Sequence, residues 1–261
     1  MTSEQLIKDP VKRKERAEEK EAAVLRFLRD EVYSSTALLA VEMGVGERAA
    51  RNVLNRMHSK RLLVKDEVKF MGMKALPLWG ITSAGIMSGL EPEEVKTVNL
   101  RHHTAGRVSP RTIEHTLDVQ RCRQYCLYQL SCRHWVPTRL LAGQNLKRNS
   151  PLRWSVYPDG VVQYPSKSGA LVPVALEVER TRKTPARYIQ IINGHLRNIR
   201  NDHYYRVVYY CQTQKEADSL KALFLRLMLQ KNITHYVSSN QTYTPEQSLT
   251  LFAFVSLEKR K

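Results

Sequence analysis

Two glutamates at alternate positions of a predicted strand constrain this chain more than any other feature. Residues 174–179 read Val-Ala-Leu-Glu-Val-Glu, and successive side chains of a strand point to opposite faces. Glu177 and Glu179 therefore share one face, and the other face is apolar. Carboxylates on a buried strand are costly unless a cation or a proton compensates them, and such oxygen donors suit Mg²⁺ or Mn²⁺. Asp159, in a Pro-Asp-Gly motif interpreted as a hairpin turn, adds a third acid before this strand.

The charge balance indicates a polyanionic partner. The chain has 261 residues, enough for two domains, and its hydrophobic content of 42% is that of a folded protein. Lys and Arg outnumber Asp and Glu by 42 to 25, a net charge of +17, which favours nucleic acid or an anionic membrane surface. No apolar run approaches the roughly 20 residues that cross a bilayer, and the charged N-terminus has no signal-peptide core. We therefore expect nucleic acid as the partner, no membrane span and a cytoplasmic location.

The cysteines do not have the spacing of a zinc site. Cys122 and Cys126 are four residues apart, as on one side of a helix, while Cys132 and Cys211 lie elsewhere in the sequence. A structural zinc site uses Cys-x-x-Cys pairs, and the chain has none. We expect buried, reduced thiols, as in a cytosolic protein.

The first third of the chain has the pattern of a small DNA-binding domain. Helices are predicted over residues 11–31, 37–43 and 47–60, and short strands follow within residues 61–82. A helix-turn-helix followed by paired strands resembles the winged helix-turn-helix family. We predict this domain over residues 1–88.

The helix predicted over residues 47–60 has two faces. Its apolar face consists of Ala50, Val53, Leu54 and Met57. Its polar face carries side chains suited to phosphates or base edges: Arg48, Arg51, Asn52, Asn55, Arg56 and Lys60. The net charge favours DNA contact over a merely solvated helix face, although winged helices also dock proteins.

The rest of the chain is predicted as a linker over residues 89–108 and a second domain over residues 109–261. The pair His102-His103 in the linker is interpreted as a loop feature in reach of phosphate. In the second domain a helix is followed by three β-like segments, a helix that Pro185 opens, a strand, a helix and a last strand at a sheet edge.

This element order resembles the PD-(D/E)xK restriction-endonuclease-like core, an αβββαβ arrangement. The fold class expected is therefore α+β or α/β with a mixed sheet, preceded by the winged helix-turn-helix. By position, Asp159 matches the first metal-binding acid of that family and Glu177 the second. Glu179 stands where the family usually has lysine. In one alternative Lys183 takes over that role; in another, Glu179 is a third metal ligand or a general base.

A narrower resemblance covers most of the chain. The motif Glu-x-Glu-Arg-Thr-x-Lys-Thr at residues 177–184, followed by Arg187-Tyr188 and an apolar helix, is similar to the MOBC class of plasmid mobilisation relaxases. These proteins are related to the replication-relaxation family. The resemblance implies nicking of one strand at a plasmid transfer origin in a bacterium, on double-stranded and locally single-stranded DNA. It also implies assembly with an accessory mobilisation protein and a coupling protein.

The chemistry expected is hydrolysis of a phosphodiester with Mg²⁺ or Mn²⁺. Asp159 and Glu177, with Glu179 as a third candidate, hold the metal, and Lys183 orients the nucleophile or offsets phosphate charge. Arginines near the motif are expected to bind the DNA backbone: Arg180, Arg182, Arg187, Arg197 and Arg200. Tyr188 is the candidate for the second alternative, covalent attack by a tyrosine. A third alternative is a non-catalytic DNA-binding replication or transfer accessory protein on a degenerate nuclease fold.

Overall fold

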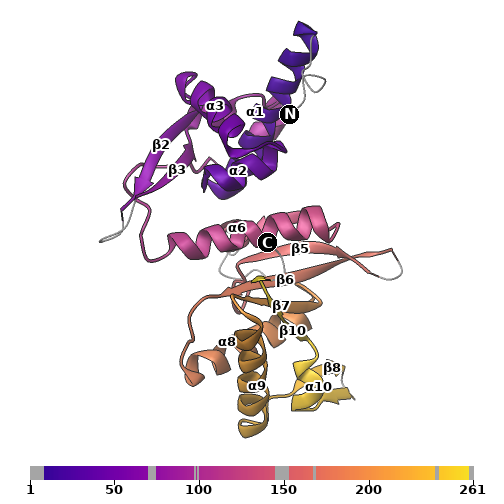
Figure 1. Ribbon diagram of the computed structural model, residues 1–261. Coiled ribbons are helices and arrows are strands. Elements are labelled where there is room, and N and C mark those ends of the chain that lie inside the picture. The colour runs from indigo at the N-terminus through magenta and orange to yellow at the C-terminus, as the bar shows by residue number, and fades with distance from the viewer. Residues whose placement is uncertain are drawn as a thin grey trace. The chain divides into compact units, whose positions relative to one another are not determined.

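The chain divides into two units within a single helix. The units of the computed structural model are Met1–Gln120 and Arg121–Lys261, and the division falls in α6 (Ile113–Gln129) (Figure 1). The sequence analysis began the second domain earlier, at residue 109. The difference arises because Ile113 and Leu117, in the first turns of α6, share a buried cluster with Leu38 of the first unit. The structure describes residues 9–69, 75–96, 98, 100–144, 153–166, 169–238 and 241–258.

The first unit combines helices with a three-stranded antiparallel sheet. Its elements are α1 (Pro10–Glu31), β1 (Tyr33–Ser35), α2 (Thr36–Met43), α3 (Glu47–Ser59), β2 (Leu63–Val68), β3 (Leu76–Ile81), α4 (Ser83–Met87) and α5 (Pro92–Val95). The strand order is β1-β3-β2. Local caps set the bounds of α2, because Ser35 accepts a hydrogen bond from the Leu38 N–H and Gly44 ends the helix with a φ of 61°.

Helices α1, α2 and α3 pack around one apolar core. Leu28 of α1, Leu39 of α2 and Leu54 of α3 are all fully buried in it. The apolar face predicted for α3 is confirmed, because the buried residues of this helix are Ala50, Val53, Leu54 and Met57. Burial of this stripe turns the opposite face of α3 to solvent.

A buried histidine holds a loop segment against this sheet. His103 Nε2 lies 2.8 Å from Asp66 Oδ2 of β2, and the His103 side chain is buried. The ring also lies against Gly80 of β3, where an added Cβ would come within 2.2 Å of the imidazole. The prediction that His103 lies in a loop is confirmed, but its interpretation as a residue in reach of phosphate is wrong, because the ring faces the strands rather than solvent.

The second unit is a mixed sheet covered by helices. This unit begins with the second half of α6. Its further elements are β4 (Arg133–Pro137), α7 (Thr138–Gln144), β5 (Gly160–Pro165), β6 (Leu171–Glu179), α8 (Pro185–Arg200), β7 (Arg206–Cys211), α9 (Gln214–Gln230), β8 (His235–Ser238), β9 (Gln241–Tyr243), α10 (Pro245–Leu249) and β10 (Phe252–Ser256). The five-stranded sheet has the order β10-β7-β6-β5-β4. The pairs β4–β5 and β5–β6 are antiparallel, and β6–β7 and β7–β10 are parallel. A mixed sheet with helices, as predicted, is confirmed.

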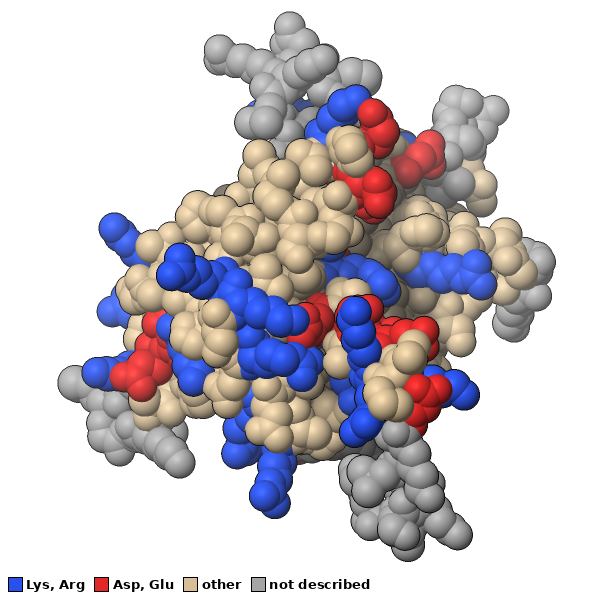
Figure 2. Space-filling model, turned by 90° about the horizontal axis from the view of Figure 1, so that it is seen from above, with Lys and Arg blue, Asp and Glu red and all other residues tan. Residues whose placement is uncertain are grey.

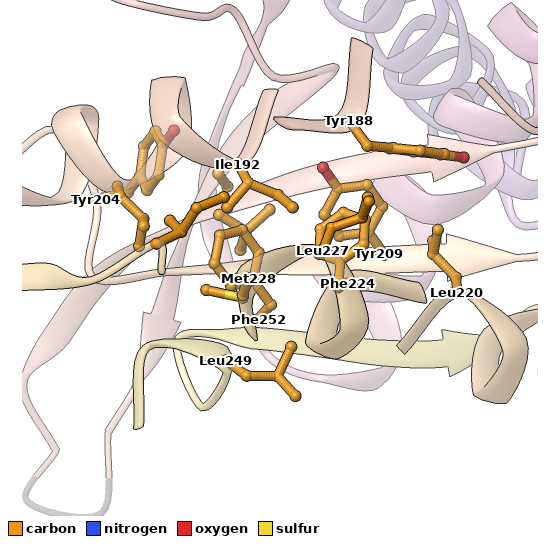
Figure 3. Packing of buried hydrophobic residues seen from close by; sticks show 14 of the residues in the cluster. Tyr188, Ile192, Tyr204, Tyr209, Leu220, Phe224, Leu227, Met228, Leu249 and Phe252 are labelled. Atoms are coloured by element: carbon orange, nitrogen blue, oxygen red, sulfur yellow. The ribbon is translucent and has the colours of Figure 1, made fainter. Parts of the chain in front are cut away.

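Helices cover both faces of this sheet. Helices α8 and α9 lie on one face, where Tyr188, Tyr209 and Phe224 pack together; the Phe224 ring centroid is 5.5 Å from that of Tyr188 and 5.2 Å from that of Tyr209 (Figures 1 and 3). The second half of α6 lies on the other face, where Cys126 Sγ is 3.4 Å from Tyr210 Oη. Adjacent residues of β7 therefore serve opposite faces, as strand geometry requires.

The Pro-Asp-Gly motif is not a hairpin turn, which corrects the sequence analysis. Residues 154–157 lie outside any strand, with bends at residues 155 and 156, and Asp159 directly precedes β5. Gly160 is the first residue of that strand and packs on Trp135 of β4, whose ring would lie 2.2 Å from an added Cβ. The glycine therefore meets a packing requirement, which a turn propensity does not reveal.

Two expectations drawn from composition are also met in the described part of the chain. All four cysteines are buried and free of disulfides. Among the described helices, none is both long and apolar enough to cross a membrane.

Candidate active site and nucleic-acid interface

Asp159 and Glu177 lie opposite one another where β5 and β6 meet. The register pairs Gly160 with Leu176, so the next residues along the antiparallel ladder are these two acids. Residues directly opposite in such a ladder point to the same face of the sheet. Asp159 Oδ2 also accepts a hydrogen bond of 2.8 Å from the Val178 N–H, which ties this carboxylate to β6.

The junction of β4 and α7 fixes the backbone around Asp159. The Thr138 N–H donates to the Asp159 carbonyl oxygen at 3.2 Å. The Thr138 hydroxyl donates to the carbonyl oxygen of Pro158. The main chain that carries Asp159 is therefore held by the first residue of α7 and its side chain by β6.

Glu179 meets a cation and a hydroxyl. Lys183 Nζ lies 2.5 Å from Glu179 Oε2, and the Tyr188 hydroxyl donates to Glu179 Oε1 at 2.7 Å. The Glu179 side chain is only 5% exposed, whereas that of Lys183 is 40% exposed. Lys183 does reach back from the start of α8, as the sequence spacing allowed, but its described contact is with Glu179.

Tyr188 is a buried donor at this site. Its side chain is fully buried, and its hydroxyl also accepts a hydrogen bond from the Lys183 N–H at 3.2 Å. Burial, with a further contribution from the Glu179 charge, raises the pKa of Tyr188 to about 12. The hydroxyl therefore keeps its proton at neutral pH and donates it to Glu179.

Glu177 meets a histidine that the sequence analysis missed. His195 Nε2, on α8, lies 3.2 Å from Glu177 Oε1. The His195 side chain is fully buried, and burial lowers its pKa to about 3, while the nearby charge of Asp159 acts in the opposite direction. His195 is therefore neutral at physiological pH.

A buried hydrogen-bond chain orients this imidazole. Asn198 Nδ2 donates to Tyr204 Oη at 2.9 Å, and Tyr204 Oη lies 2.6 Å from His195 Nδ1. Because the Tyr204 oxygen accepts from Asn198, its own proton is directed to His195 Nδ1. The histidine proton is then assigned to Nε2, on the side of Glu177. The overlooked signal was polar residues at positions 195 and 198, within the apolar stripe of this helix.

The chemical type of the donor atoms at this site fits a divalent cation. Asp159 and Glu177 supply carboxylate oxygens, which Mg²⁺ and Mn²⁺ prefer. Each oxygen of Glu179 accepts a hydrogen bond, and its neighbours are Lys183 and Tyr188 rather than the other two acids. Within the described ranges, no group of three or more His, Cys, Asp or Glu residues is arranged to hold a metal ion. The fit therefore depends on two acids.

The arginines expected to bind DNA occupy different places around α8. Arg187 and Arg197 line one groove on the exposed side of this helix, together with Gln190 and Asn193. Arg200 lines a second groove at the C-terminal end of the helix. Arg180 and Arg182 lie beside Glu179 in a small pocket, and Arg182 donates to the Glu216 carbonyl oxygen at 2.8 Å.

The polar face of α3 is exposed, but its cations differ in their partners. Arg48, Arg51, Asn52 and Asn55 are exposed, and Arg51 and Asn55 line a groove with Lys65 of β2. Arg51 forms an exposed ion pair with Glu47 of the same helix at 3.6 Å, whereas Arg56 and Lys60 pair with Glu21 of α1, at 2.7 and 2.9 Å. Figure 2 shows one face of the molecule, on which many Lys and Arg side chains and fewer Asp and Glu side chains are exposed.

The comparisons with known proteins add no family. A scan against protein-family models, a search of curated proteins and a search of solved structures each found no significant match to this chain.

Proposed function

We propose that the protein is a metal-dependent DNA strand-nicking endonuclease, a relaxase that acts at a plasmid transfer origin. The observation that carries the proposal is the placement of Asp159 opposite Glu177, on the face that α8 covers. Two carboxylates that meet beside a basic surface suit the hydrolysis of a phosphodiester.

The topology of the second unit supports a PD-(D/E)xK-like core. A helix, α6, precedes the antiparallel strands β4, β5 and β6, and α8 then connects β6 to the parallel strand β7. The order is αβββαβ except that α7 lies between the first and second strands; Asp159 directly precedes the second strand, and Glu177 lies near the end of the third. This is the arrangement that the family resemblance implies for its metal-binding acids.

The first unit supports a winged helix that contacts duplex DNA. Helices α2 and α3 are joined by a turn at Gly44, and the β2–β3 pair follows as the wing (Figure 1). Arg48 and Arg51 lie on the exposed face of α3, where phosphates or base edges would be reached.

In this proposal Asp159 and Glu177 hold Mg²⁺ or Mn²⁺. The bound ion supplies charge neutralisation for the phosphate and lowers the pKa of an attacking water. His195 Nε2 lies 3.2 Å from one oxygen of Glu177 without a hydrogen bond to it, so the imidazole limits where this carboxylate can lie. Glu179 holds Lys183, whose ammonium is exposed enough to offset charge on a bound phosphate.

The surroundings of Tyr188 favour hydrolysis over covalent attack. A nucleophilic tyrosine must reach the phosphate and lose its proton. Tyr188 is fully buried, and the pKa of its hydroxyl is raised to about 12. We therefore rank the covalent alternative second.

The test is incubation of the full chain with supercoiled plasmid that carries its own transfer origin. With Mg²⁺ or Mn²⁺, nicked circles are expected, and with chelator none. Asp159→Ala is expected to abolish nicking while DNA affinity is retained. Metal-independent nicking, or none from the wild-type protein, would refute the proposed chemistry.

The non-catalytic alternative keeps the DNA-binding surface alone. A DNA-binding accessory protein would bind the origin fragment and yield no metal-dependent nick. In both cases Arg51→Ala is expected to weaken duplex binding and to reduce the magnitude of the salt slope by about one. An unchanged salt slope would indicate that α3 docks a protein instead. The accessory mobilisation and coupling proteins are proposed on the family resemblance alone.

A further inference from the structure

We propose that Tyr205 and Tyr236, with Arg200 beside them, form a base-stacking site for single-stranded nucleic acid. This site goes beyond the nicking proposal, because binding there requires neither metal nor cleavage. The site lies at the start of β6, where Val172 lines the same groove. Glu177 is five residues beyond Val172, which corresponds to about 17 Å along the strand at about 3.3 Å per residue.

Two large aromatic side chains are exposed in one groove. Tyr205 is 64% exposed and Tyr236 is 58% exposed, and both line the groove at the C-terminal end of α8. The ring of the adjacent Tyr204 is buried in the core. Of these two neighbouring tyrosines, one therefore packs in the core and the other is exposed to solvent. Exposed ring faces are what unstacked bases bind in single-strand-binding proteins.

The backbone on both sides of the groove is anchored. The Tyr205 N–H donates to the Pro173 carbonyl oxygen of β6 at 2.8 Å. Tyr236 lies on β8, opposite Thr242 of β9 in an antiparallel pair. A stacking surface needs rings whose positions are set before binding, since ordering them would reduce the affinity.

The charges that lead to the groove suit a polyanion. Arg187, Arg197 and Arg200 are all exposed on α8, over about 20 Å at 1.5 Å per residue. Arg187 and Arg197 line one groove and Arg200 lines the groove of the tyrosines, so positive charge lies at and next to the proposed site. Asp202 also lines the groove, so the stacking energy there comes from the rings more than from net charge.

Nucleic acid is favoured over a protein partner by this arrangement. Tyrosine and arginine also occur at protein interfaces, so the choice depends on charge: the net charge of +17 favours a polyanion. The two exposed rings with Arg200 beside them are a combination that stacks on bases and holds phosphates. Binding by a second copy of this chain is the competing outcome.

The experiment measures binding of a fluorescein-labelled oligothymidylate of about 12 nucleotides to the full chain in EDTA. Tyr205→Ala and Tyr236→Ala are each expected to weaken binding about tenfold, and the corresponding Tyr→Phe variants to bind normally. Tyr128→Ala is the matched control, since Tyr128 is 52% exposed on α6 of the same protein. An abasic oligonucleotide of equal length has no bases to stack, so the alanine variants and the wild-type protein should bind it with the same affinity.

A fluorescence measurement covers the case in which an alanine variant fails to fold. Tyr205→Trp should bind normally, and its indole emission should be quenched as thymine stacks on it. Wild-type affinity in both alanine variants, or no quenching in Tyr205→Trp, would overturn the proposal. So would dimerisation of the wild-type protein that Tyr236→Ala abolishes, because the groove would then bind a second copy.

The outcome is separable from that of the nicking assay. Asp159→Ala should leave oligothymidylate binding unchanged even if it abolishes nicking. If the wild-type protein nicks DNA under no condition but binds oligothymidylate through the two tyrosines, the nuclease proposal is rejected. The proposal of the stacking site then stands.

Discussion

Glu177 and Glu179 lie two residues apart on the same face of one strand, yet α8 gives them different surroundings. Glu179 meets the Lys183 ammonium and the Tyr188 hydroxyl, whereas Glu177 meets the neutral imidazole of His195. A lysine ammonium compensates the charge of a carboxylate directly, whereas a neutral imidazole does not. The covering helix, rather than the strand, therefore gives the two acids different neighbours.

The largest expected effect separates the two acids by activity. Glu177→Gln should reduce metal-dependent nicking by at least about 100-fold, because an amide binds a divalent ion poorly. Glu179→Gln should reduce it by only about tenfold, through displacement of Lys183. Nicking rates on supercoiled plasmid measure both. Equal losses would mean that the two glutamates act together in one cluster, and the contrast drawn from their neighbours would fail.

Stability should show the reverse contrast for Glu179. Glu179→Ala leaves the buried Tyr188 hydroxyl without this acceptor, which costs about 1–3 kcal/mol of unfolding free energy. The lost contact with Lys183 adds little, since that side chain is 40% exposed and water can solvate it. Urea denaturation gives the value. A variant as stable as wild type would show that Tyr188 finds another partner.

The neutral state of His195 predicts a loss of stability in acid. Its pKa is about 3 in the folded protein and near 6.5 when unfolded, so below pH 6.5 the unfolded chain takes up a proton that the folded one does not. Stability from this residue is complete above pH 6.5 and falls by about 2 kcal/mol between pH 6.5 and 5. Urea denaturation of wild type and His195→Gln at both pH values tests this. Parallel decreases would mean that His195 already carries a proton when folded.

The smallest effect concerns Tyr188. Tyr188→Phe removes one buried hydrogen bond and should lower the unfolding free energy by about 1 kcal/mol, with nicking largely retained. In a double-mutant cycle it should cancel part of the cost of Glu179→Ala, because the two residues are in contact. Complete loss of nicking, together with a covalent DNA adduct in the wild-type protein, would instead establish the tyrosine as the nucleophile.

Local patterns were sufficient to predict the elements and their faces. The apolar spacing of α3 predicted its buried residues, and Pro185 predicted the start of α8. Alternation along β6 placed both glutamates on one face. These features depend on residues within one element, so a single sequence contains the information.

Contacts between distant elements were not predictable in the same way. Gly160 was interpreted as a turn glycine, because the sequence does not show that Trp135 packs against it. His195 was overlooked because its partners, Glu177 and Tyr204, come from two other elements. The buried contact of His103 was missed for the same reason, since its partner Asp66 lies 37 residues away. A polar residue within an apolar stripe is the one local sign of such networks.

The contact between Gly160 and Trp135 has a consequence for descent as well as for packing. An alanine at position 160 would put a methyl group 2.2 Å from the indole, so either the Trp135 ring or the β4–β5 pair would have to shift next to Asp159. A lineage with that one change would keep all its acidic residues in a sequence alignment, although the packing beside Asp159 had changed. Among relatives of this chain, an intact glycine at this position is therefore a better marker of a working site than the acids alone.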